Sequence, residues 1–287
     1  MVHSTTEHLP IAIIGAGPIG LAAASHLVER KLPFMVLEAA DQVGASIREW
    51  GHVPLFSPWR YLLDRSAERL LGESGWQKPD ETAIPTGGAF LDAYLGPLAN
   101  LPALKPNISY GAKVVAIGRR GFDKVKSQGR ERQPFEILLE NGARLLASAV
   151  LDASGTWYQP NPIGSGGVAA IGEQAARDHI AYGIPDIFGA ERARYQGKRV
   201  LVVGSGHSAM NNLLQLLNLG VEGSQSSVIW ALRRDAMDQV YGGGEADALP
   251  ARGALGAKVK TAVNEGRMQV VTPFRIYEIS KTADGLR

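Results

Sequence analysis

The sequence has 287 residues, of which 45% are apolar and 20% charged, so it can bury a sizeable core and form one large domain or two modest ones. It contains no cysteine, which excludes disulfides, cysteine-ligated zinc and a cysteine nucleophile or redox pair among these residues. The 30 basic and 28 acidic side chains give a net charge of +2, which is too balanced to indicate a nucleic acid or an anionic membrane as a partner. Glycine is abundant, at 34 residues, which indicates tight turns or close approach of the backbone to a ligand.

The N-terminal segment, MVHSTTEHLP, lacks the basic start and the apolar run of a secretion signal. The apolar stretch over 11–28 is broken by glycines and a proline, so it predicts a strand, a turn and a helix rather than a membrane span. We therefore expect a soluble, cytoplasmic protein. The six histidines show no metal-binding spacing, so we expect no metal site.

Residues 11–38 have the pattern of a dinucleotide-binding unit. The sequence predicts a buried strand at 11–15, a helix at 21–31 and a second strand at 34–38. The motif GAGPIG, from Gly15 to Gly20 with Pro18 inside it, satisfies G-x-G-x-x-G between the first strand and the helix.

Each glycine of this turn has a predicted role. Gly15 permits the tight turn, Gly17 lets the backbone approach a pyrophosphate, and Gly20 allows close helix–strand packing. Glu38 ends the second strand, where its carboxylate would accept hydrogen bonds from ribose hydroxyls. The competing interpretation is a purely structural glycine turn, but a strand, a helix and an acid in register favour dinucleotide binding.

The middle of the chain contains helices and then a sheet. Residues 41–60 are aromatic-rich and irregular, and two helices are predicted at 61–72 and 88–96. Short strands are predicted at 113–120, 134–140 and 143–155, with a hairpin turn at Asn141-Gly142. The proline- and glycine-rich start of 156–198 indicates a connector.

A second unit begins near Lys198 and repeats the first. A strand at 199–204 leads through GSGHSA, residues 204–209, into a helix at 210–220 and a strand at 227–234. A helix at 253–266 and strands over 268–280 complete it. This second strand ends in Arg233-Arg234 instead of an acid, and guanidinium groups there would bind a 2′-phosphate, which favours NADPH over NADH. The alternative is an exposed arginine pair at a strand end.

The repeat indicates an α/β protein with two Rossmann-like, three-layer domains and β-meander insertions. We expect a first cofactor domain at 1–163, a linker at 164–197 and a second cofactor domain at 198–287. The second copy stops where its hairpin is expected, so we expect it to be incomplete and the chain to be a fragment.

These features resemble the two-dinucleotide-binding-domain flavoproteins, and within them the flavin-containing monooxygenase-like branch. The resemblance rests on GAGPIG with Glu38, Gly44 in DQVGAS, LFSP at 55–58, the run from DASGTW to PNPIG at 152–164, and GKRVLVVGSGHSA at 197–209. It extends over most of the chain, although the glycine motifs alone are shared by the whole superfamily.

The resemblance implies that the first unit binds FAD and the second NADPH. The FAD residues it implies are Gly15, Gly17, Pro18, Gly20, Glu38, Gly44, Val114 beside the adenine, and the turn Ala153, Ser154 and Gly155. The NADPH residues it implies are Gly204, Gly206, Ser208 and Ala209 at the pyrophosphate, with Arg233 or Arg234 at the 2′-phosphate.

Three functions remain open at this stage. The first is a monooxygenase in which NADPH and O₂ oxygenate a small molecule, with no catalytic side chain identified. The linker departs from the monooxygenase pattern, because Ile171 replaces a phenylalanine before Gly172 and the spacing to His179 and Tyr182 differs. The second is an NADPH-dependent flavoprotein reductase or oxidase with a non-thiol acceptor. The third is a truncated, non-catalytic dinucleotide-binding protein. For all three functions, a homodimer is one expected assembly.

Overall fold

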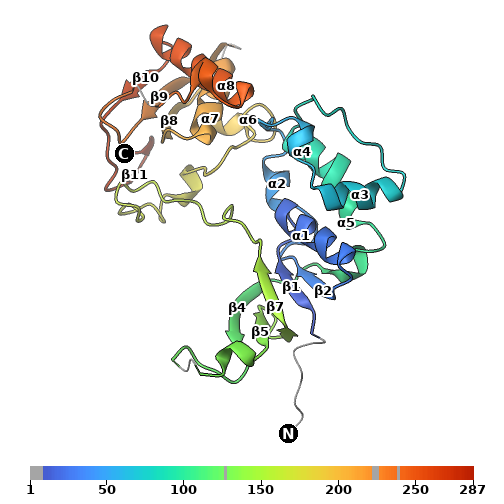
Figure 1. Cartoon of the computed structure of the whole chain (residues 1–287). Coiled ribbons are helices and arrows are strands. Elements are labelled where there is room, and N and C mark those ends of the chain that lie inside the picture. Colours follow the sequence, from blue (N-terminus) through green and yellow to red (C-terminus); the bar gives the residue numbers. More distant parts are fainter. Residues whose placement is uncertain (1–8, 126–127, 222–225, 238–239) are drawn as a thin grey trace. The chain divides into compact units, whose positions relative to one another are not determined.

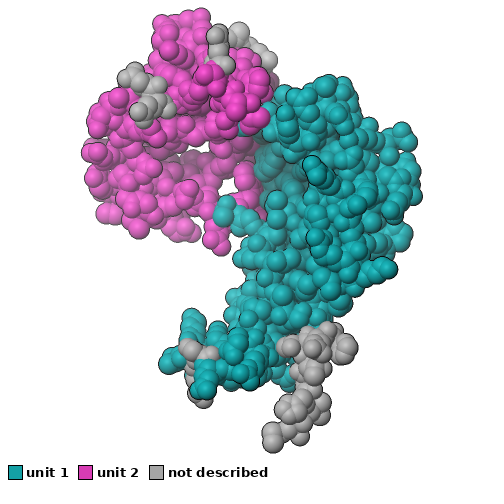
Figure 2. Space-filling model, viewed as in Figure 1, with its two compact units in different colours: residues 1–156 teal, residues 157–287 magenta. Residues whose placement is uncertain are grey.

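A computed structural model describes residues 9–125, 128–221, 226–237 and 240–287. The chain forms two compact units that divide after Thr156 (Figures 1 and 2), and each unit has its own core. The division lies seven residues before the expected end of the first domain, and residues of the expected linker pack within the second unit. Among the described residues, no helix is long and apolar enough to cross a bilayer.

The first unit is built on a parallel sheet in the order β3-β2-β1-β7. Its strands are β1 (Ile11–Ile14), β2 (Phe34–Leu37), β3 (Ile108–Ser109) and β7 (Ala149–Asp152). Alternate residues point to opposite faces, so Ile13 and Val36 join the core beneath the helices while Ala12 and Leu37 join the core on the other side. Both faces are therefore covered, as the apolar β1 predicts.

The helical layer covers one face of this sheet (Figure 1), and its members are α1 (Pro18–Glu29), α2 (Ala45–Glu49), η2 (Trp59–Tyr61), α3 (Arg65–Glu73), α4 (Gly87–Phe90), the π-helical η3 (Leu91–Leu95), α5 (Gly96–Ala99) and η4 (Lys105–Asn107). The helix expected at 61–72 begins later, at Arg65. The reason is Asp64, whose side chain accepts hydrogen bonds from the N–H groups of Ser66 (2.9 Å) and Ala67 (3.1 Å) and so caps the helix.

The helix expected at 88–96 is longer and runs from 87 to 99 through the π-helical segment. Pro97 has no N–H to donate to the carbonyl of Ala93, four residues earlier. That carbonyl instead accepts the indole N–H of Trp76, at 2.7 Å. The wider turn is therefore accommodated by a side chain from another part of the unit.

The third layer is an antiparallel meander in the order β4-β5-β6. Its strands are β4 (Val114–Arg119), β5 (Phe135–Leu139) and β6 (Arg144–Ala147), with η5 (Arg130–Arg132) before β5. The hairpin predicted at Asn141-Gly142 joins β5 to β6, with Gly142 at φ 87°. The stretch 143–155 is not one strand, because the chain leaves the meander at Ser148 and β7 pairs with β1.

The second unit contains a parallel sheet in the order β10-β9-β8. Its elements are η6 (Arg177–His179), α6 (Arg192–Tyr195), β8 (Arg199–Val203), α7 (His207–Val221), β9 (Ser227–Ala231), η7 (Gly244–Ala246), α8 (Pro250–Asn264), β10 (Gln269–Val271), β11 (Lys281–Thr282) and β12 (Gly285–Leu286). Helices α7 and α8 share one core with one face of the sheet, centred on the fully buried Trp230.

The strands expected over 268–280 are mostly absent, because only Gln269–Val271 is extended within the sheet. Pro273 cannot donate a ladder hydrogen bond, so β10 ends before it. The following segment pairs instead with residues of the expected linker: the N–H of Ile171 bonds to the carbonyl of Tyr277 (2.8 Å), and the N–H of Ile279 to the carbonyl of Ile171 (2.7 Å).

Candidate dinucleotide-binding sites

The first candidate site is the glycine turn between β1 and α1. Gly15 has φ +96°, and a Cβ there would lie 2.7 Å from the carbonyl oxygen of Ala153, so the tight turn requires glycine. A Cβ on Gly20 would lie only 2.0 Å from the carbonyl oxygen of Gly15, which confirms the close helix–strand packing predicted for it. Gly17 differs, because a Cβ placed on it would meet no described atom within 4 Å beyond its own chain neighbours, and the space beside it is open.

The N-terminus of α1 follows this open glycine, and neither a capping side chain of the described residues nor an acid of its own first turn occupies it. Gly17 is the N-cap and Pro18 the first helical residue, no side chain of the described residues caps the helix, and the first turn holds no acidic residue. The free N–H groups and the positive end of the helix dipole therefore remain available for an anion such as a pyrophosphate.

Glu38 is held beside the turn by two backbone N–H groups. Its Oε2 accepts from Ala16 at 2.7 Å and its Oε1 accepts from Ala40 at 2.9 Å. Each carboxylate oxygen can accept a second hydrogen bond, so the group is fixed in position and can still bind the hydroxyls of a ribose. This geometry fits the predicted role.

Two further predicted elements border the same edge of the sheet. Gly44 is the N-cap of α2 at φ 58°, its N–H bonds to the carbonyl of Ala16 (3.2 Å), and a Cβ there would lie 2.4 Å from Cδ2 of Leu91. The turn of Ala153, Ser154 and Gly155 follows β7, and the N–H of Ala153 bonds to the carbonyl of Ile14 (2.9 Å). Gly44 and this turn both have structural reasons for their conformations, and their contact with a cofactor stays a prediction.

Sequence reasoning missed Asp152, which orders that turn. Its Oδ1 accepts hydrogen bonds from the hydroxyl (2.7 Å) and the N–H (3.1 Å) of Ser154, and these bonds lower the pKa of Asp152. The spacing Asp-x-Ser at a strand end is the signal that could have identified it. Val114, predicted beside the adenine, opens β4 and is partly buried against the meander core, and its contact with a ligand stays a prediction.

The second candidate site is a similar glycine turn, between β8 and α7. Gly204 has φ +111°, its N–H bonds to the carbonyl of Ala231 (3.1 Å), and its own carbonyl accepts the indole N–H of Trp230 (2.7 Å). No described atom lies within 4 Å of a Cβ placed on Gly206, as at Gly17. Ser208 is exposed in the first turn of α7, which has no acidic residue, and Ala209 is buried beneath it.

The two predicted arginines follow β9 at the same sheet edge as this turn, because Ala231 is the register partner of Val203. Both are exposed, but they differ in their contacts. Arg233 donates from Nη1 to the carbonyl of Ser165 at 3.1 Å. Among the described residues, Arg234 is contacted through its backbone carbonyl, which accepts a hydrogen bond from the Thr272 hydroxyl. The Arg233 guanidinium is thus partly engaged within the unit, and the contact of either arginine with a phosphate stays a prediction.

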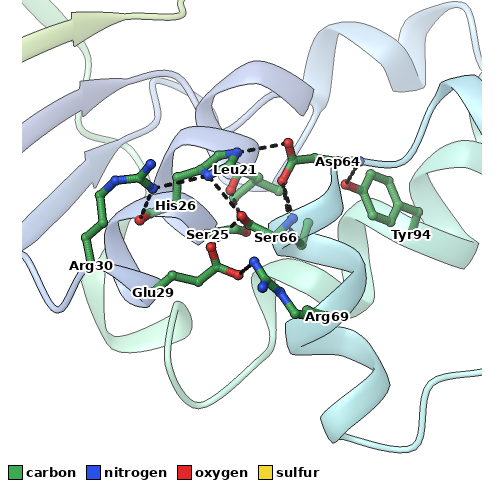
Figure 3. Close-up of polar contacts among 10 residues, drawn as sticks. Leu21, Ser25, His26, Glu29, Arg30, Asp64, Ser66, Arg69 and Tyr94 are labelled. Carbon is green, nitrogen blue, oxygen red and sulfur yellow. Dashed lines mark hydrogen bonds and ion pairs between the residues drawn. The ribbon is translucent and has the colours of Figure 1, made fainter.

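A polar cluster between α1 and α3 contains a serine, a histidine and an aspartate (Figure 3). His26 Nε2 lies 3.1 Å from Oδ2 of Asp64, and His26 Nδ1 lies 2.9 Å from Oγ of Ser66. Ser66 is only 1% exposed, and its hydroxyl also donates to Glu29 at 2.7 Å. A substrate cannot reach this oxygen, so the cluster joins two helices and is no nucleophilic triad.

A buried carboxylate organises the expected linker. Glu173 is 4% exposed and accepts from the N–H groups of Ala170 (2.8 Å) and Ile163 (3.0 Å) and from the hydroxyl of Tyr182. Burial alone would raise its pKa, but these hydrogen bonds outweigh burial and lower it. Gly172 is required here, because a Cβ would lie 2.1 Å from the carbonyl oxygen of Ile279. Within the described parts of the chain, no group of three or more potential metal ligands gathers.

Comparison with known proteins agrees with this arrangement. Residues 13–74 match the family model of the NAD(P)-binding Rossmann-like domain. A ferredoxin–NADP reductase of Thermus thermophilus is 23% identical over 274 residues, covering 95% of this chain and 64% of that protein. The indole-3-pyruvate monooxygenase YUCCA1 of Oryza sativa is 26% identical over 226 residues, covering 74% of this chain and 46% of that protein. The chain thus spans about half to two thirds of the length of these relatives.

Solved structures give the same fold. The bacillithiol disulfide reductase of Bacillus cereus aligns with a TM-score of 0.69 at 18% identity, over 97% of this chain and 74% of that one. A flavin-containing monooxygenase from Stenotrophomonas maltophilia aligns with a TM-score of 0.56 at 22% identity, over 97% and 75%. The chain therefore has the fold of these oxidoreductases, and residues 13–74 of its first unit match the NAD(P)-binding Rossmann-like domain.

Proposed function

We propose that this chain belongs to an FAD- and NADPH-dependent oxidoreductase of monooxygenase type, which uses O₂ to oxygenate a small molecule. The observation that carries the proposal is the contrast between two otherwise matching sites. Each has an open glycine, Gly17 or Gly206, at the start of a helix, but the neighbouring strand ends in a carboxylate in one unit and in arginines in the other.

The residues present fit these two cofactors. FAD has no 2′-phosphate, so a carboxylate anchored like Glu38 suits its adenosine ribose, whereas a 2′-phosphate is matched by the exposed Arg234. When bound, FAD supplies the redox chemistry, by accepting a hydride and returning electrons to an acceptor. The chain's own residues would hold each pyrophosphate at a helix N-terminus and each ribose beside it.

The overall reaction balances with NADPH as the reductant. NADPH and O₂ supply two electrons and two oxygen atoms; one oxygen enters the substrate and the other leaves as water with a proton from solvent. No described side chain needs to act as a nucleophile, and the Ser66 cluster is too buried to do so. Support for an oxygenating reaction comes from the sequence relationship to YUCCA1.

A second candidate is an NADPH-dependent flavoprotein reductase with a non-thiol acceptor. The ferredoxin–NADP reductase of Thermus thermophilus favours it, because that alignment covers 95% of this chain. The absence of cysteine means that no dithiol within these 287 residues can take the electrons.

The test begins with an absorbance spectrum of the purified protein after incubation with FAD. We expect flavin bands that bleach anaerobically on addition of NADPH. Admission of ¹⁸O₂ with candidate substrates should then place ¹⁸O in a product, whereas turnover without label, with reduction of an added one-electron acceptor, favours the reductase. A protein that binds no flavin contradicts both candidates and leaves the non-catalytic dinucleotide-binding protein.

A further inference from the structure

Tyr110 lies directly beside Glu38 at the carboxyl edge of the first sheet. The N–H of Glu38 bonds to the carbonyl of Ser109 (2.9 Å), and the N–H of Ala112 bonds to the carbonyl of Glu38 (2.8 Å). The N–H of Gly111 bonds to the carbonyl of Ala40 (2.9 Å). Residues on both sides of Tyr110 are thus tied to the segment that starts at Glu38, and the position of the tyrosine is set by backbone hydrogen bonds.

The tyrosine side chain is accessible although its neighbours are held in place. It is 44% exposed, which leaves part of its ring open to solvent. Burial of the rest, and next the charge of Glu38, raise the pKa of the phenol, which agrees with a position close to the carboxylate. The residue after Glu38 is the small, exposed Ala39, so no large side chain at that position competes for the edge beside Glu38.

This placement suits one part of a dinucleotide. A ribose bound by Glu38 carries its base at the neighbouring ring carbon, so the base falls within reach of residues that flank the carboxylate. An aromatic side chain loses little conformational entropy when a base stacks on its ring. Such stacking stabilises a bound base without selecting which base is bound.

We infer that Tyr110 is a positioning residue of the first site, whose ring stacks against the adenine of the bound dinucleotide. The inference rests on the proposed function, since it assumes that FAD binds in the first unit. The ring carries the effect, and the hydroxyl is dispensable. A ligand that lacks adenosine, such as FMN, should gain nothing from this residue.

The test measures FAD and FMN dissociation constants by flavin fluorescence for the full chain and for Tyr110→Ala, Tyr110→Leu and Tyr110→Phe. We expect FAD to bind about tenfold more weakly to the Ala and Leu variants, a loss within the range measured for single base–aromatic stacks, and normally to the Phe variant. The affinity for FMN should be the same in all four proteins. Tyr61→Ala is the matched control, because Tyr61 is another exposed tyrosine of the same unit, 66% exposed, in η2 and not in the segment that follows β3.

The outcomes distinguish a failure of the inference about Tyr110 from a failure of the proposed function. Wild-type protein that binds FAD, with Ala and Leu variants that bind it equally well, overturns the role of Tyr110 and leaves the proposed function intact. Equal weakening of FAD and FMN also overturns it, because the ring would then support the fold instead of the adenine. Wild-type protein that binds neither FAD nor ADP overturns the proposed function itself. The Leu variant retains apolar volume, so it keeps the test valid where Ala lowers stability.

Discussion

Replacement of Gly17 by alanine separates cofactor binding from folding. Gly17 has φ −83° and ψ −173°, a conformation that alanine adopts without strain, and no described atom lies within 4 Å of the added methyl group. Removing a glycine at such a position reduces the freedom of the unfolded chain and stabilises a protein by about 0.4–1 kcal/mol. We therefore expect Gly17→Ala to melt at or slightly above the wild-type temperature, by about 1–4 °C.

The same methyl group occupies the space through which a pyrophosphate would approach the backbone. Loss of one hydrogen bond between a backbone N–H and a charged phosphate costs about 1.5–3 kcal/mol, which corresponds to about 10- to 100-fold weaker binding. Gly20→Ala is predicted to behave in the opposite way. Its Cβ would overlap the Gly15 carbonyl oxygen at 2.0 Å, and overpacking against backbone destabilises by about 1–3 kcal/mol or more.

The assay combines thermal unfolding with FAD titration of the wild type, Gly17→Ala and Gly20→Ala. Gly72→Ala is a suitable control, because Gly72 lies in α3 with no described atom within 4 Å of an added Cβ and far along the chain from the turn. Gly17→Ala should lose affinity without losing stability, and the control should keep both. Unchanged FAD affinity in a stable Gly17→Ala protein would refute the location of the pyrophosphate at this turn.

Three further expectations concern other parts of the chain. Arg234→Ala should raise the KM for NADPH about tenfold in steady-state kinetics and leave the KM for NADH unchanged, and equal changes in both would contradict a contact with the 2′-phosphate. Ser66→Ala should lower the free energy of unfolding in urea by about 1 kcal/mol, because it removes the hydrogen bonds of Ser66 to the partly buried Glu29 and to His26, while NADPH oxidation per folded molecule stays the same. Glu173 has a pKa lowered below the ordinary 4.5, so its ionised form stabilises the second unit above that value and this stability is lost as pH falls through the lowered pKa. Urea midpoints between pH 3 and 6 should therefore fall less steeply for Glu173→Gln than for the wild type, whereas the exposed Glu265→Gln should follow the wild type.

The sequence predicted the parts of the fold in which local chemistry and tertiary structure agree. The unit from β1 to β2 was predicted closely, because a buried strand, a glycine turn and the helix after it each depend on a few neighbouring residues. The roles of Gly15 and Gly20 in the turn are confirmed by their contacts. The roles of Gly17, Glu38 and Arg234 toward cofactors stay predictions, because they concern a ligand.

The rest depends on contacts between distant residues. The apolar run at 143–155 gives no sign that the chain changes from the meander to the parallel sheet at Ser148, since both strands have similar composition. In the π-helical turn at Leu91–Leu95, the carbonyl of Ala93 accepts a hydrogen bond from the indole N–H of Trp76, which lies 17 residues earlier in the sequence. Tyr110 was missed for the same reason: its importance follows from its place beside Glu38 in space, which its own neighbours in sequence do not reveal.

The two glycine turns also differ at the third glycine position of their motifs, which is Gly20 in the first unit and Ala209 in the second. Gly20 and Ala209 each occupy the third residue of the helix that follows the turn. A methyl group is excluded at Gly20, yet Ala209 carries one and is 8% exposed. The packing of α7 on its turn therefore accommodates a methyl group at a position where the packing of α1 does not. The third position of the motif thus reports how closely helix and turn pack, while the open second glycine, common to both, is the position that a pyrophosphate would use.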